Sequence, residues 1–172
     1  MHGVMIEVHG LGILLVGPSG IGKSECALVL IERGHRLVAD DRVELVRLPG
    51  NRIVATPAPL LKHHLEIRGL GVLNVRDLFG ATAVQDEAHL DLVVGLRPLE
   101  DGGEFDRLGV DEATRDILGV AIPALDVPVY PGRDMGVLLE VAARNQLLKR
   151  AGHHSAREFA ERLARGLGIE GG

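Results

Sequence analysis

The feature that most constrains this chain is a glycine-rich segment at positions 17–24. The segment is a complete G-x-x-x-x-G-K-[ST] phosphate-binding loop, made of Gly17, Pro18, Ser19, Gly20, Ile21, Gly22, Lys23 and Ser24. Residues 13–16 before it form an apolar run typical of a buried strand, and residues 24–33 after it are helix-like. In this setting backbone N–H groups and a helix start surround an anion, so the loop predicts binding of a nucleoside triphosphate. A glycine-rich turn without a ligand is the alternative, and the complete motif disfavours it.

The composition sets bounds on the partners of the chain. Its 172 residues suit one domain with its own core. Aromatic residues make up only 2% and there is no Trp, so we expect an aliphatic core and no stacking platform for single-stranded nucleic acid. A net charge of −5 also disfavours a nucleic-acid backbone as partner.

The single cysteine, Cys26, excludes an internal disulfide and is expected to be a packed thiol in the helix after the loop. No apolar stretch reaches about 18 residues, so we expect no membrane span. The first residues lack the basic and apolar regions of a signal peptide. These features favour a cytoplasmic protein.

The first half of the chain reads as strands around one helix. Strands are predicted at residues 5–8, 13–16 and 36–39, and the crossover through the helix makes the last two parallel. A hairpin is predicted from residues 43–48 and 52–56, because Pro49-Gly50-Asn51 lies between them.

The middle of the chain is less regular, and the pattern becomes helical only near the C-terminus. Residues 65–75 hold two glycines in an apolar pattern, strands are predicted at 91–96 and 117–122, and three prolines (Pro123, Pro128 and Pro131) indicate an extended loop. A helix is predicted over 134–150, and Ser155 with Glu158 forms a capping box for a last helix over 156–167. We therefore expect one mixed α/β domain over residues 1–172, with a helical C-terminal extension at about 134–167.

Two adjacent acids, Asp40 and Asp41, follow the predicted strand at 36–39. In open α/β sheets ligands collect at the carboxyl edge of the strands, which is where the phosphate loop also lies. One carboxylate there can bind Mg²⁺ and the other can accept a proton from an attacking hydroxyl. A turn or cap pair is the alternative for two aspartates, and their position after a strand favours the functional interpretation.

A series of motifs in one order gives the chain a family resemblance. These are His2-Gly3, the loop 17–24, the segment 34–41 (GHRLVADD), the segment 65–75 (LEIRGLGVLNV), the segment 105–109 (FDRLG) and the segment 128–133 (PVYPGR). From His2 to about Leu163 the chain closely resembles the catalytic domain of bifunctional HPr kinase/phosphorylase. The loop alone is shared by many proteins, whereas the blocks at 65–75 and 128–133 are far more specific.

The resemblance implies roles for individual residues. Asp41 matches the family's proton acceptor in the serine kinase reaction and its proton donor in the reverse reaction. Lys23 matches the phosphate-binding lysine, Ser24 and Glu66 match magnesium ligands, and Asp40 is a further candidate ligand. His2 and Arg107 match other active-site positions, residues 65–74 match a segment used in both reactions, and residues 128–133 match one tied to dephosphorylation. We add the hypothesis that Arg133 holds the attacking phosphate.

The resemblance also implies a fold, cofactors and partners. It implies a mixed sheet with C-terminal helices and a nucleotide site similar to that of phosphoenolpyruvate carboxykinase. ATP and Mg²⁺ would be the cofactors, and the phosphocarrier HPr of the sugar phosphotransferase system would be the substrate. In the reverse reaction inorganic phosphate would yield pyrophosphate. The family regulates carbon metabolism and forms homohexamers.

The sequence departs from the family pattern at two positions. Tyr130 stands where Arg is expected, and Asp134 where Asn is expected. A lost cation and a gained anion beside a phosphate-handling segment disfavour phosphorolysis relative to kinase activity. The family usually carries a regulatory domain ahead of the catalytic one, and the sequence leaves open whether that domain is naturally absent or trimmed.

Single residues also have plainer interpretations. His2 could be a frayed terminal residue, Glu66 and Arg68 a surface pair, Arg107 an ion-pair partner of Asp106, and Arg133 part of a solvated turn. His63-His64 and His153-His154 lack a third ligand at useful spacing, so we interpret them as surface or packing residues.

Two other functions remain open at this point. A small-molecule kinase could use the same loop, although residues 97–107 hold too few arginines for the lid of such an enzyme. A regulatory module could bind ATP without transferring phosphate, which the retention of both Asp41 and Glu66 disfavours.

Overall fold

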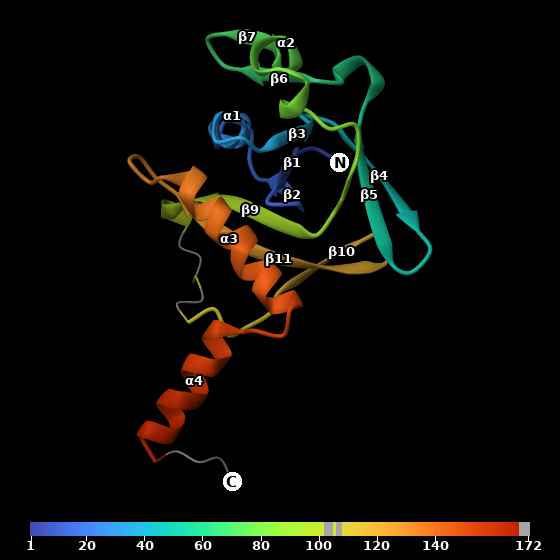
Figure 1. Cartoon of the computed structure of the whole chain (residues 1–172). Helices are drawn as coiled ribbons and strands as arrows, with labels where there is room; N and C mark the ends of the chain where they lie inside the picture. The colour runs from blue at the N-terminus through green and yellow to red at the C-terminus, as the bar shows by residue number, and fades with distance from the viewer. Residues whose placement is uncertain (102–104, 106–107, 169–172) are drawn as a thin grey trace.

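A six-stranded mixed sheet forms the centre of the molecule (Figure 1). The computed structural model describes residues 1–101, 105 and 108–168. The strand order is β10-β11-β9-β2-β1-β3, with the bounds β1 (Val4–Val8), β2 (Leu11–Val16), β3 (Arg36–Ala39), β9 (Leu92–Pro98), β10 (Thr114–Ile117) and β11 (Val120–Val129). The mixed sheet with C-terminal helices confirms the predicted α/β class.

Within the described residues, two smaller sheets and four helices accompany this centre. One sheet is β4 (Val43–Leu48), β5 (Arg52–Pro57) and β8 (Ala88–His89), and the other is β6 (His64–Ile67) and β7 (Gly71–Asn74). The helices are α1 (Lys23–Glu32), α2 (Val75–Phe79), α3 (Met135–Arg150) and α4 (Ser155–Gly166), with short 3-10 turns η1 (Pro59–Leu61), η2 (Ala81–Ala83) and η3 (Leu99–Asp101). The β4–β5 pair confirms the hairpin predicted around residues 49–51.

Strand directions decide which loops meet. β2, β9 and β11 run parallel, and β1 is antiparallel to both β2 and β3. β2 and β3 therefore point the same way, as predicted, but β1 lies between them. The carboxyl ends of β2 and β3 and the start of β1 consequently share one edge of the sheet, which brings the phosphate loop, Asp40-Asp41 and His2 together.

Both faces of the main sheet are covered, which is why its strands are apolar without alternation. Side chains such as Ile13 and Leu15 pack on one face with α1, α3 and β6, and side chains such as Leu14 and Val93 pack on the other with the β4–β5–β8 sheet. Cys26 lies in the first of these cores, and burial raises the pKa of its thiol to about 11. The cores are aliphatic, and the thiol is packed as predicted.

The strand predicted at residues 117–122 is wrong. β10 ends at Ile117 and β11 begins at Val120, and the two residues between them form a tight hairpin turn. Leu118 and Gly119 have φ of 52° and 78°, so both occupy the left-handed region that such a turn requires. The pattern failed because a leucine in that region gives no sequence signal for a turn.

The loop predicted from the three prolines is also wrong over most of its length, because β11 continues to Val129. The N–H of Ala124 donates to the Ala113 carbonyl on the β10 side. The nitrogen of Pro128, four residues later, points the same way but lies beyond the last β10 pair, Thr114↔Pro123. A missing N–H therefore costs no ladder hydrogen bond there.

The two C-terminal helices differ in how they are held. α3 packs against the sheet, whereas α4 extends away from the body, as Figure 1 shows, and none of its side chains is buried. α4 begins one residue earlier than predicted, because His154 rather than Ser155 caps it by accepting a hydrogen bond from the Arg157 N–H. The described helices include none long and apolar enough for a membrane crossing.

Candidate active site

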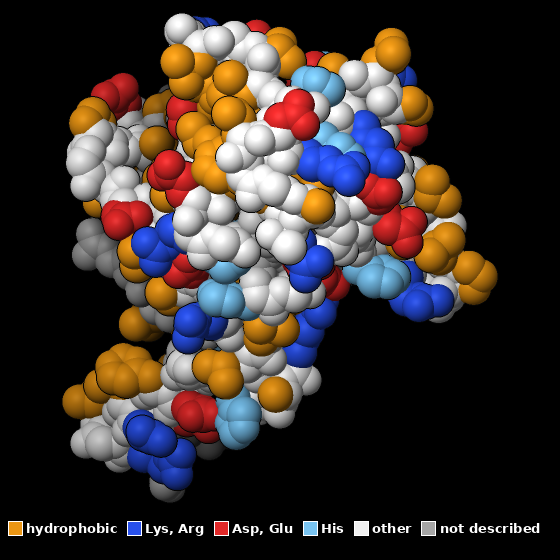
Figure 2. Space-filling view, turned by 45° about the horizontal axis from the view of Figure 1, so that its top comes forward, with side chains coloured by type: hydrophobic (Ala, Val, Ile, Leu, Met, Phe, Trp, Pro, Cys, Tyr) orange, Lys and Arg blue, Asp and Glu red, His pale blue; other side chains and the backbone are white. Residues whose placement is uncertain are grey.

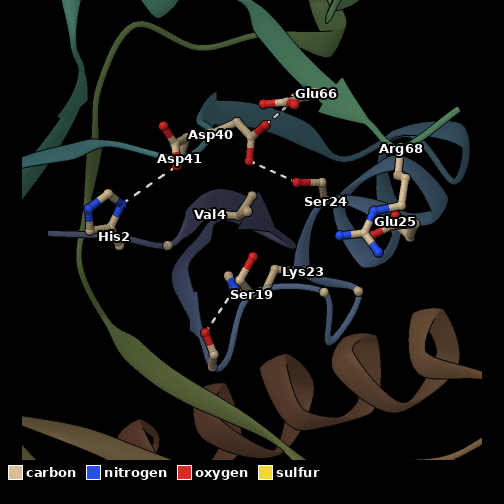
Figure 3. Close-up of a pocket in the computed structure, with 14 residues that line it drawn as sticks. His2, Val4, Ser19, Lys23, Ser24, Glu25, Asp40, Asp41, Glu66 and Arg68 are labelled. Carbon is tan, nitrogen blue, oxygen red and sulfur yellow. Dashed lines mark hydrogen bonds and ion pairs between the residues drawn. The ribbon is translucent and has the colours of Figure 1, made fainter. Parts of the chain in front are cut away.

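A cleft of about 580 Å³ opens at the sheet edge where the phosphate loop and the acidic pair meet (Figure 3). Its lining comes from the start of β1, the loop, the first turn of α1, the end of β3 and the β6 hairpin. The lining residues are His2, Gly3, Val4, Gly17, Ser19, Gly20, Gly22, Lys23, Ser24, Glu25, Asp40, Asp41, Glu66 and Arg68. The cleft thus gathers most of the residues that the sequence predicts for the site.

The loop turns directly into the first residue of α1. Gly22 precedes that helix with φ of 104°, a left-handed conformation that favours glycine. The Lys23 ammonium donates to the carbonyls of Gly17 and Pro18, at 2.8 and 3.1 Å. The cation and the N-terminus of α1 therefore lie on the same side of the cleft, where both attract phosphate.

Asp40 joins two elements at the bottom of the cleft. Its side chain is buried, accepts a hydrogen bond from the Ser24 hydroxyl at 3.0 Å and accepts another from the Glu66 N–H at 2.9 Å. Burial raises the pKa of this carboxyl, and the two hydrogen bonds partly oppose that shift. The Ser24 hydroxyl, Asp40 and Glu66 supply hard oxygen donors within one cleft, which is the donor chemistry that Mg²⁺ prefers.

Asp41 points into the same cleft but remains accessible. Its side chain is 65% exposed, and one carboxylate oxygen lies 3.5 Å from Nδ1 of His2. The Gly3 N–H donates to the Asp41 carbonyl, which holds the start of β1 beside the acidic pair. A Cβ at Gly3 would lie 2.6 Å from the carbonyl oxygen of Leu15, so this close approach requires glycine. Asp41 is thus placed to meet a hydroxyl group that enters from solvent.

The described lining of the cleft includes neither of the two predicted arginines. Arg107 is outside the described residues. Arg133 does not line the cleft, and its guanidinium donates to the Pro128 carbonyl at 2.7 Å and lies 5.2 Å from the centre of the Tyr130 ring. Asp134, the second departure from the family pattern, caps α3 by accepting from the Val137 N–H. An Asp at position 134 is therefore explained by its capping of the N-terminus of α3.

Arg68 is a lining residue that sequence reasoning did not select. In the sequence it is one of residues 65–74 and a possible surface partner of Glu66, and the structure places both side chains at the cleft. The available signal was their spacing, because residues two apart on a strand face the same side. A candidate ligand at Glu66 therefore implied that Arg68 would face the ligand too.

A second polar cluster lies outside the cleft, where α3 meets the end of α1. His9, His35 and Glu140 bring donor atoms within 4.8 Å of one another, the one such group found among the described residues. Arg33 forks onto the Glu140 carboxylate, and Nε of Arg144 lies 3.4 Å from His9. Arg33 already neutralises the one carboxylate of this cluster, and Arg144 adds a second positive charge. The cluster is therefore better suited to holding α3 against α1 than to binding a cation.

Replacing Glu140 by Gln is expected to loosen this clamp. The Arg33 and His35 hydrogen bonds lower the pKa of Glu140 to about 2 from 4.5. The stabilisation is therefore complete above about pH 4.5 and is lost as the pH falls towards 2. Because Arg33 is partly exposed, we expect a loss of about 1–2 kcal/mol at pH 7. Thermal unfolding at pH 7 and pH 3 measures it.

The control for Glu140→Gln is Glu161→Gln on the exposed face of α4. The difference in melting temperature between wild type and Glu140→Gln should shrink at pH 3, while Glu161→Gln should match wild type at both values. A Glu140→Gln melting temperature equal to that of wild type at pH 7 would show that the clamp does not contribute.

Comparisons with known proteins place the chain in a family. The family described as HPr Serine kinase C-terminal domain matches residues 1–163. An HPr kinase/phosphorylase of Leptospira biflexa is 49% identical over 94% of the chain and 51% of its own length, and one of Bacillus subtilis is 47% identical over 95% and 53%. The solved Hpr(Ser) kinase/phosphatase of Coxiella burnetii superposes with a TM-score of 0.83 at 33% identity, covering 92% of this chain and 96% of that one. The chain spans about half the length of the curated relatives it matches.

Proposed function

Because the chain belongs to the HPr serine kinase C-terminal domain family, we propose that it transfers the γ-phosphate of ATP to a serine of the phosphocarrier HPr. The observation that carries this proposal is the shared cleft of Lys23, on the phosphate loop, and Asp41, at the end of β3. The loop suits a triphosphate, and an exposed carboxylate beside it suits activation of an alcohol. A binding module would need only the first of these.

The proposed chemistry assigns a role to each of these groups. Asp41 takes the proton of the serine hydroxyl while the serine oxygen forms a bond to the γ-phosphorus of ATP. The bond between that phosphorus and the bridging oxygen breaks at the same time, which releases ADP. Lys23 stabilises the negative charge on the phosphates. His2, 3.5 Å from Asp41, orients that carboxylate.

We further propose that Mg²⁺ is held by Ser24, Asp40 and Glu66, where it would neutralise charge on the phosphate chain. Their oxygen donors and their common cleft support this assignment. The remaining family features are proposals as well: one catalytic domain over residues 1–172, a nucleotide site of the phosphoenolpyruvate carboxykinase kind, a homohexamer and a cytoplasmic location.

A direct assay tests the proposed function. The chain is incubated with Mg-ATP and purified HPr, and phosphoserine on HPr is measured by mass spectrometry, with an HPr whose acceptor serine is changed to Ala as control. Phosphoserine on HPr supports the proposal. Tight ATP binding without transfer would favour the regulatory module, and transfer to a metabolite would favour the small-molecule kinase.

The reverse reaction, phosphorolysis of phosphoserine by inorganic phosphate to give pyrophosphate, supplies a separate prediction. If the guanidinium of Arg133, which lies outside the cleft lining, meets the attacking phosphate, Arg133→Ala should lower phosphorolysis by about tenfold or more and kinase activity by much less. Pyrophosphate release and HPr phosphorylation measure the two directions. An equal loss in both would remove this role for Arg133, and Arg115→Ala, at an exposed arginine of β10, serves as control.

A further inference from the structure

The Arg68 guanidinium lies close to the phosphate loop at Gly20. Its two terminal nitrogens are 3.8 and 4.0 Å from the point where a Cβ on Gly20 would stand. Lys23 and Arg68 are the two Lys or Arg side chains among the described residues that line the cleft. Lys23 is occupied by loop carbonyls, whereas Arg68 has no hydrogen-bond or ion-pair partner within the described part of the chain.

The backbone around Arg68 holds this side chain in place. Arg68 follows β6, and the buried Asp40 carboxylate fixes that strand through the Glu66 N–H. Gly69 and Gly71, with φ of 92° and 87°, then turn the chain back into β7. An arginine at the start of such a turn is directed at the loop by the hairpin and not by a side-chain partner.

Arg68 and Asp41 lie at opposite ends of the cleft. Figure 3 shows Asp41 beside His2 at one end and Arg68 beside Glu25 at the other, with Ser24 and Lys23 between them. If Asp41 activates the acceptor hydroxyl, the transferred phosphate lies at the Asp41 end. The phosphates that remain on the nucleotide then extend past Lys23 towards Arg68.

We propose that Arg68 binds the non-transferred phosphates of the nucleotide, those that ATP and ADP share. A guanidinium fork forms two charge-assisted hydrogen bonds to phosphate oxygens, which suits this position better than a single ammonium would. This role rests on the proposed function, because that function sets the direction in which the phosphate chain lies in the cleft. It assigns Arg68 to affinity for the nucleotide rather than to the chemical step.

Nucleotide titrations test this role without any acceptor protein. Binding of MgATP and of MgADP to the chain is measured by calorimetry for wild type, Arg68→Gln and Arg68→Lys. Arg68→Gln should weaken both ligands equally, by about 10- to 100-fold. Arg68→Lys should lose less, because it keeps the charge but not the fork. Arg76→Gln, at an exposed arginine of the neighbouring α2, should bind as wild type.

Three outcomes would overturn the proposal. Unchanged affinity for both nucleotides would show that Arg68 does not meet a phosphate. A loss for ATP alone would place Arg68 at the transferred phosphate. A fall in kcat with an unchanged KM for ATP would make Arg68 part of the chemical step. If no HPr phosphorylation is found, the equal loss of ATP and ADP affinity still stands as a separate result.

Discussion

Asp41→Asn is expected to lower the rate of HPr phosphorylation by about 10²–10⁴-fold while leaving MgATP affinity within about twofold of wild type. An amide has nearly the shape of the carboxylate but cannot accept the serine proton. The backbone should tolerate the change, because Asp41 has φ of 66° and Asn is among the residues that adopt this conformation most readily. Single-turnover transfer and calorimetric ATP titration measure the two quantities separately.

The matched control for this prediction is Glu44→Gln. Glu44 is an exposed acid on β4 that does not line the cleft, so its replacement should leave both quantities unchanged. Normal transfer by Asp41→Asn would mean that another group is the base. Loss of both ATP affinity and transfer in Asp41→Asn would instead mean that Asp41 contributes to nucleotide binding. The serine proton would then need a different acceptor.

Gly12→Ala is expected to destabilise the fold by about 3–5 kcal/mol, because β2 passes against His89 with no room for a side chain. A Cβ at Gly12 would lie 1.7 Å from the carbonyl oxygen of His89 and 2.7 Å from the end of the Met5 side chain. The first contact is with backbone, so no rotamer change relieves it. Thermal unfolding should show a melting temperature lower by roughly 10 °C or more.

Gly166→Ala is the control for steric crowding, because nothing lies within 4 Å of a Cβ at that position in α4. This variant should be neutral or slightly stabilising. A Gly12→Ala protein as stable as wild type would contradict the close approach of β2 to His89. The contrast between the two glycines separates a requirement for space from the general effect of adding a methyl group.

Local signals predicted the centre of the site well. The phosphate loop and its helix depend on a contiguous motif, and Asp40-Asp41 follows directly from the strand before it. The resemblance to a family supplied Glu66 and His2, which are far apart in sequence, and the structure brings both to the cleft. Which of them act in catalysis remains a prediction.

Features that depend on pairing across the sheet were not predictable in the same way. β1 lies between β2 and β3 because it pairs with both of them. The sequence of a strand alone does not determine which strands it pairs with. The continuation of β11 through Pro128 depends on β10 ending first. The Arg33, His35 and Glu140 cluster joins residues more than 100 positions apart, so no spacing rule could reveal it.

The buried Asp40 makes two distant parts of the chain energetically dependent on one another. One of its carboxylate oxygens accepts a hydrogen bond from the Ser24 hydroxyl in the first turn of α1, and the other accepts one from the Glu66 N–H in β6. A side-chain donor and a backbone donor that share one carboxylate in this way do not contribute independently. The free-energy changes of altering the loop and the hairpin together should therefore not equal the sum of the separate changes. Helix α1 and the β6–β7 hairpin are therefore expected to behave as a single thermodynamic unit.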